Sequence, residues 1–205
     1  MANLKITPSV WQAYAKFSNS ENYTFRTNTI ISNTNNPITR SHNHLFSVIM
    51  FNPGSSSPAE LTNNEMISPC SLDSTMRRII QWTEIAAINK TIPIDSFITI
   101  YNLYNIVTPD INKALDQITM NSDLLIKEEI DLNYHQRPKF IWKAWGISGL
   151  DVVKNRIKDI ELIISNNKIP VIGDHHPSLK NYHPSYLNRD KIRRSLIIDE
   201  ISKYL

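Results

Sequence analysis

Four short apolar runs stand out along the chain, and stretches with helical character separate them. The runs cover residues 45–51, 97–101, 140–144 and 170–172. A continuous apolar run of this kind is typical of a strand that is buried on both faces. The helical stretches cover residues 73–87, 109–134, 149–165 and 190–204. This alternation predicts an α/β fold with three α/β/α layers around a central, mostly parallel four-stranded sheet.

The first 44 residues are more polar than the remainder and are rich in Asn, Ser and Thr. We expect them to form a polar extension packed on an α/β domain that spans residues 45–205. Residues 10–17 are expected to be a short helix or a docked arm. Residues 23–31 alternate weakly between polar and apolar positions, which predicts an edge strand.

Composition narrows the class of protein. Apolar residues make up 41% of the 205 residues, which argues against a disordered chain. No run approaches the roughly 20 apolar residues of a membrane span, so we expect no membrane contact. With a single cysteine, Cys70, and no apolar segment at the N-terminus, the sequence predicts a cytoplasmic protein. Cys70 is expected to be a small packing residue, and nothing in the sequence demands a dimer.

Basic residues are concentrated near the C-terminus. Residues 175–205 hold six Lys or Arg and three acidic residues, an excess equal to the net charge of +3 of the whole chain. Such a patch points to a phosphate-bearing partner, although a solvated helix face has the same composition.

Polar clusters follow the predicted strands. They are Asn52-Pro53-Gly54, Asn102-Leu103-Tyr104, Trp145-Gly146 and the late segment His183-Pro184-Ser185-Tyr186-Leu187. Because ligands bind at the carboxyl ends of parallel strands, we expect the four clusters to converge on one site.

Taken in this order, the clusters resemble the motifs of the uracil-DNA glycosylase superfamily over roughly residues 45–190. Residues 49–57, Ile-Met-Phe-Asn-Pro-Gly-Ser-Ser-Ser, look most like the mismatch-type branch, whose motif reads Ile-Asn-Pro-Gly-x-x-Ser. The chain resembles more closely a bacterial and phage domain family of unassigned activity. That family shares these elements and an Asp-x-Thr-x-Arg-Arg element, which is residues 73–78 here.

The resemblance implies a DNA glycosylase that hydrolyses the N-glycosidic bond of a flipped pyrimidine and leaves an abasic site, without a metal or another cofactor. Asn52 would orient the attacking water and His183 would donate a hydrogen bond to the leaving base. Asn102 would read the base, and Phe51 and Gly54 would border it. The expected DNA contacts are Ser71, Ser185, Leu187, Arg77, Arg189 and Arg193.

Gly54 stands where the strict uracil-removing branch carries a tyrosine that rejects substituents on carbon 5 of the base. A glycine removes that barrier, so we expect a mismatched or modified, 5-substituted pyrimidine as substrate. Such an activity would suit DNA repair or defence against phage with altered bases. The stacking aromatic ring has three candidates, Phe51, Tyr101 and Tyr104.

Other interpretations stay open. The same fold suits a non-catalytic binder of nucleotides or nucleic acid, or an enzyme that processes nucleosides or nucleotides. Locally, Asn52 is also a suitable turn cap, Leu187 a core residue and His183 an ordinary loop residue. The pairs His42/His44 and His175/His176 invite a metal hypothesis, but their spacing matches no known zinc motif.

Overall fold

The computed structural model describes residues 10–20, 22–34, 38–39, 41–52, 54–58, 67–120, 130–132, 136–146, 151–173 and 182–205. Its centre is a seven-stranded sheet in the order β4-β1-β2-β5-β3-β6-β7. The strands are β1 (Gln12–Ser20), β2 (Tyr23–Ser32), β3 (Asn43–Met50), β4 (Ser68–Cys70), β5 (Ser96–Asn102), β6 (Ile141–Lys143) and β7 (Val171–Ile172). The helices are α1 (Ser74–Ala86), α2 (Ile111–Met120), α3 (Asp151–Asn167), α4 (Pro184–Leu187) and α5 (Lys191–Tyr204).

The four predicted strands are confirmed as β3, β5, β6 and β7, and they pair in parallel. The prediction of a four-stranded, mostly parallel sheet is nevertheless wrong. β4, β1 and β2 add three antiparallel pairings on the far side of β5. β1 alternates between buried and half-exposed positions, β4 spans only three residues, and β2 mixes Arg, Thr, Asn and Ser among its apolar residues. None of the three therefore shows a continuous apolar run.

The N-terminal region is part of the sheet. A helix or an arm was expected for residues 10–17, but most of that segment belongs to β1, with Ala13, Ala15 and Phe17 buried. The predicted strand at residues 23–31 exists as β2, but it is not at an edge, because it lies between β1 and β5. The sheet therefore runs without a break across the expected boundary at residue 44.

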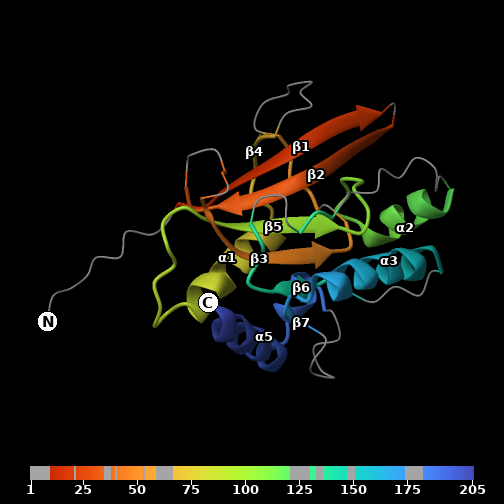
Figure 1. Cartoon of the computed structure of the whole chain (residues 1–205). Helices are drawn as coiled ribbons and strands as arrows, with labels where there is room; N and C mark the ends of the chain where they lie inside the picture. Colours follow the sequence, from red (N-terminus) through yellow and green to blue (C-terminus); the bar gives the residue numbers. More distant parts are fainter. Residues whose placement is uncertain are drawn as a thin grey trace, which may run out of the picture.

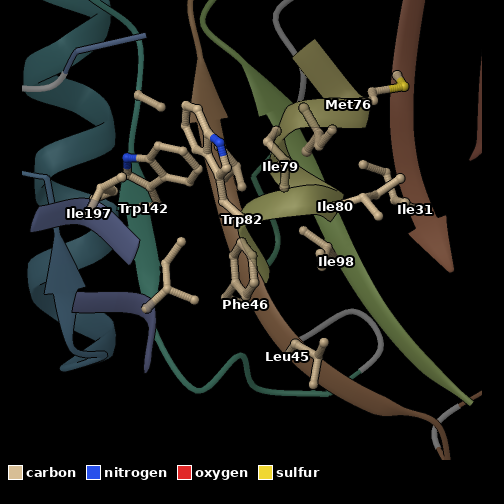
Figure 2. Close-up of a cluster of buried hydrophobic side chains, with 14 of the residues drawn as sticks. Ile31, Leu45, Phe46, Met76, Ile79, Ile80, Trp82, Ile98, Trp142 and Ile197 are labelled. Carbon is tan, nitrogen blue, oxygen red and sulfur yellow. The ribbon is translucent and has the colours of Figure 1, made fainter. Parts of the chain in front are cut away.

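Helices cover both faces of the sheet (Figure 1). On one face, α1 and α5 bury a cluster that includes Phe46, Trp82, Trp142 and Ile197 (Figure 2). On the other face, α2 and α3 pack on a second cluster that contains Ile49, Tyr101 and Ile141 from the sheet. The predicted helix starting at residue 73 is confirmed, since Asp73 caps α1 by accepting hydrogen bonds from the amides of Thr75 and Met76.

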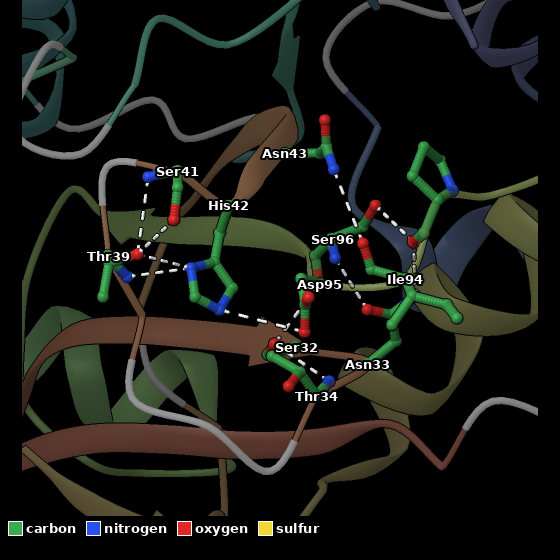
Figure 3. A network of polar contacts seen from close by, with 11 residues as sticks. Ser32, Asn33, Thr34, Thr39, Ser41, His42, Asn43, Ile94, Asp95 and Ser96 are labelled. Carbon is green, nitrogen blue, oxygen red and sulfur yellow. Dashed lines mark hydrogen bonds and ion pairs between the residues drawn. The ribbon is translucent and has the colours of Figure 1, made fainter.

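A polar network holds the amino ends of β3 and β5 (Figure 3). The Asn33 carboxamide oxygen accepts from the Ser96 amide at 2.7 Å. His42 Nδ1 accepts from the Thr39 amide at 3.1 Å, and its Nε2 lies 4.0 Å from Asp95. This network fixes the end of the sheet opposite to the carboxyl ends of its parallel strands. Within the described ranges, no helix is long and apolar enough to cross a membrane.

Candidate functional site

A pocket of about 260 Å³ lies at the carboxyl ends of β3 and β6. It brings together residues from five separate parts of the chain. The lining residues are Met50, Phe51, Asn52, Gly54, Ser55, Asp73, Ser74, Thr75, Thr108, Pro109, Trp145, Gly146, His183, Ser185 and Tyr186. Three of the four predicted polar clusters therefore meet in one concave site.

Parallel pairing of β3 with β6 positions two of these clusters. The Ala144 amide donates to the Ile49 carbonyl at 2.8 Å, which places Trp145-Gly146 beside the residues that follow β3. Gly146 has a φ of +79°, and a Cβ there would lie only 3.9 Å from the Cβ of His183. The turn after β6 thus brings the backbone into contact with the late His183 segment.

Asn52 is half-buried, and its carboxamide is oriented by the backbone. Its Nδ2 donates to the Thr108 carbonyl at 2.7 Å. This bond uses the amide nitrogen as donor, and the carboxamide oxygen is the acceptor of the side chain. A carboxamide held in this way can accept a hydrogen bond from water, but it cannot ionise and take a proton.

His183 caps the short helix α4. Its Nδ1 accepts from the Ser185 amide at 3.2 Å. Burial is the main cause that lowers the pKa of His183 to about 4; Arg78 adds to the effect, and the charge of Asp73 opposes it. At neutral pH the ring is therefore uncharged. With Nδ1 acting as acceptor, the proton is on Nε2, so the ring can donate one hydrogen bond.

Asp73 is a pocket residue that the sequence indicated only as the start of a helix and of the Asp-x-Thr-x-Arg-Arg element. While Oδ1 caps α1, Oδ2 is buried and lies 3.5 Å from Nη1 of the fully buried Arg26. A Cβ at position 54 would lie 3.0 Å from Oδ2. Gly54 therefore lets Asp73 approach closely without a displacement of its carboxylate, a reason for glycine that the sequence did not reveal.

Asn102 does not line the pocket. It is fully buried at the end of β5, where its Cα is paired with that of Met50. The residues after these two strands stay in register, because the Leu103 amide donates to the Met50 carbonyl at 2.8 Å. Asn52 and Asn102 therefore lie at the same end of the sheet, but only Asn52 borders the pocket.

The aromatic candidates also separate. Phe51 lines the pocket. Tyr104 does not line it, but its ring packs edge-on against the Phe51 ring, with 5.8 Å between the ring centres. The Tyr101 hydroxyl donates to the Asp131 carbonyl at 2.8 Å, away from the pocket lining. Trp145 and the exposed Tyr186, which we did not expect as stacking rings, complete the aromatic lining.

Of the expected DNA contacts, Ser185 lies at the pocket. Its hydroxyl is 3.5 Å from both Arg78 Nη1 and Thr75 Oγ1. Ser71 is exposed on the loop before α1 and accepts from the Ser57 amide at 3.1 Å. Leu187 is only 2% exposed and packs in the cluster under α1 and α5, so it does not protrude toward a ligand.

The expected cationic contacts differ in their surroundings. Arg77 and Arg189 are exposed. Arg193 pairs with Asp190 at 3.2 Å, and its guanidinium stacks over Tyr182 at 4.8 Å from the ring centre. Arg193 is therefore held by neighbours within its own segment.

Two other kinds of site, a metal centre and a reactive cysteine, find no support in the described parts of the chain. No group of three His, Cys, Asp or Glu side chains there could hold a metal ion. The His175/His176 pair lies outside the described residues. Burial raises the pKa of the Cys70 thiol, which keeps it protonated at neutral pH and a poor nucleophile.

No protein-family model, no curated protein and no solved structure matches this chain.

Proposed function

We propose that the chain is a DNA glycosylase that releases a mismatched or modified pyrimidine from the sugar and leaves an abasic site. The observation that carries the proposal is that Asn52 and the uncharged His183 border the same small pocket. Sites for drug-sized ligands typically measure about 300–1,000 Å³. A pocket of about 260 Å³ is suited to a single group the size of a base.

In the proposed reaction, the Asn52 carboxamide oxygen holds a water molecule, and the water oxygen forms a bond to C1′ of the sugar. The bond between C1′ and the base nitrogen breaks, and its electron pair moves onto the base. His183 Nε2–H donates a hydrogen bond to the base oxygen where this charge collects. A donor preorganised at such an oxygen lowers the barrier by about 3 kcal/mol. The base takes up a proton that the water loses, and it leaves as the neutral free base.

Gly54 supports a substrate that carries a group on carbon 5, because no side chain at this position narrows the pocket. The proposed role is repair, or defence against phage with altered bases, in the cytoplasm. The four motifs that resemble the uracil-DNA glycosylase superfamily support the same assignment. Excision of plain uracil together with refusal of all 5-substituted pyrimidines would contradict the substrate proposal.

A second candidate is a protein of the same fold that binds nucleotides or nucleic acid without chemistry. The burial of Asn102 outside the pocket favours this candidate, since the residue expected to read the base does not reach it. The neutral Asn52 favours it as well, because a carboxamide is a weaker catalyst than a carboxylate.

The variant Asn52→Ala separates the two candidates. Release of free base from oligonucleotides with mismatched or 5-substituted pyrimidines is measured beside the affinity for the same DNA. The glycosylase proposal predicts a loss of release of about 100-fold or more with nearly unchanged affinity. Asn112→Ala, an exposed position on α2, is the matched control and should release base like the parent protein. Equal release by Asn52→Ala and by the parent protein would refute the proposed role of Asn52.

A further inference from the structure

A second concave surface lies between α1 and α5. It is a groove of about 610 Å³, with Trp82, Ile85 and Ile198 among the apolar lining residues. Lys90, Lys191 and Arg194 also line it, against a single acidic residue, Asp199. We define this surface as the α1/α5 groove. Its cationic side chains outnumber its acidic one, so it is suited to an anionic partner.

The α1/α5 groove and the pocket are both lined by helix α1. The first residues of α1, Ser74 and Thr75, line the pocket, and residues in its second half line the groove. Arg78 Nη1 approaches Ser185 Oγ at 3.5 Å and joins α1 to the segment that leads into α5. At the other end, Lys90 Nζ donates to the Ser202 carbonyl. Helices α1 and α5 therefore lie side by side (Figure 1).

We propose that the α1/α5 groove binds the phosphate backbone of the DNA whose base enters the pocket, an inference that rests on the proposed function. A strand with one base in the pocket has to continue over the surface of the protein, and this groove is cationic and shares α1 with the pocket. With 13 residues, α1 is about 20 Å long. About six phosphates of one strand of a duplex span that length.

Two cations of the groove are open to contact with phosphate. Lys191 is exposed and Arg194 is half-buried. Arg193, by contrast, points to Asp190 and Tyr182. Because the groove and the pocket share α1, we favour DNA over an acidic peptide as the occupant. An acidic peptide has no base that could enter the pocket.

The test is the salt dependence of binding to a 20-base-pair duplex of ordinary bases, measured by fluorescence anisotropy between 50 and 200 mM salt. Each phosphate contact that is lost lowers the slope of log affinity against log salt by about 1. The double variant Lys191→Gln/Arg194→Gln should lose about 2 from the slope, and Lys191→Gln alone about 1. The control Lys113→Gln/Lys158→Gln changes the net charge equally at exposed positions on α2 and α3, and should keep the parent slope.

An unchanged slope in the groove variants, or an equal fall in the control, would overturn the proposal. So would a dependence on Lys191 and Arg194 that appears for a polyglutamate peptide but not for the duplex. The assay involves no base release. Absence of release with a reduced slope would therefore refute the proposed function alone, while release with an unchanged slope would refute the groove alone.

Discussion

The Arg26 guanidinium lies 3.5 Å from the Asp73 carboxylate, Nη1 to Oδ2, with both side chains buried. Arg26 lies on β2, in the antiparallel half of the sheet, whereas Asp73 caps α1 and lines the pocket. The pair thus ties the antiparallel half of the sheet to the wall of the candidate site. A buried ion pair of this kind is costly to break, because removal of one partner leaves the other charged and desolvated.

We therefore predict that Arg26→Met lowers the free energy of unfolding by about 3 kcal/mol or more, measured by urea denaturation. Lys143→Met is the matched control, since Lys143 is also buried and pairs with Glu161 at 2.6 Å. Glu161 is 41% exposed, so water can solvate it once the lysine is gone, and the loss should be smaller. Equal losses for the two variants would contradict the special cost of the Arg26–Asp73 pair.

The contact between Gly54 and Asp73 gives a second prediction. Gly54→Ala places a Cβ 3.0 Å from Asp73 Oδ2 and should destabilise the protein by about 1–3 kcal/mol. Asp73→Ser keeps a capping hydroxyl and removes Oδ2. The cost of Gly54→Ala should fall in that background, which a double-mutant cycle measures. Additive effects would show that the two positions do not collide.

His183 predicts a dependence of stability on pH. Its pKa is about 4 in the folded protein and about 6.5 when unfolded, so the unfolded chain takes up the proton at higher pH. The contribution of His183 to the free energy of unfolding is therefore fully present above pH 6.5. It decreases as the pH falls toward 4, and the total loss is about 3 kcal/mol. His183→Asn retains a cap acceptor and should lose this part of the pH dependence. An identical pH profile in the variant would contradict the lowered pKa of His183.

Leu187 was expected to contact DNA as a wedge that fills the space left by the flipped nucleotide, whereas its burial is that of a packing residue. Because it is 2% exposed within the cluster under α1 and α5, Leu187→Ala should cost about 2–5 kcal/mol in the free energy of unfolding. Tyr186→Ala, at the exposed neighbouring position, should cost far less. A fully stable Leu187→Ala protein with weakened DNA binding would instead support the wedge.

The central sheet could be predicted from the sequence where strands are buried on both faces, as in β3 and β5, because continuous apolar runs mark them. β1 was missed although its buried Ala13, Ala15 and Phe17 have the spacing of a half-buried strand, because two of the three are small alanines in a region rich in Asn and Ser. Strand pairing across long sequence separations, such as β2 with β5, leaves no local signal.

The site was predictable where special backbone residues follow strands, as at Asn52 and Gly146. Asp73 was not, because its local signal is that of a helix cap and its place at the pocket depends on tertiary packing. Asn102 was expected at the pocket. Because side chains alternate between the two faces of a strand, Asn102 is on the same face as Ile98 and Ile100, which pack under α1 and α5. It is buried there and does not line the pocket.

The central claim is that a pyrimidine is released at the pocket formed by Asn52 and His183. Mass spectrometry of free bases after incubation with genomic DNAs that carry natural and hypermodified bases tests it most directly. We predict a free pyrimidine, mismatched or 5-substituted in origin, with the parent protein and none with Asn52→Ala. No released base from any of these DNAs, with the protein folded and bound to them, would contradict the claim.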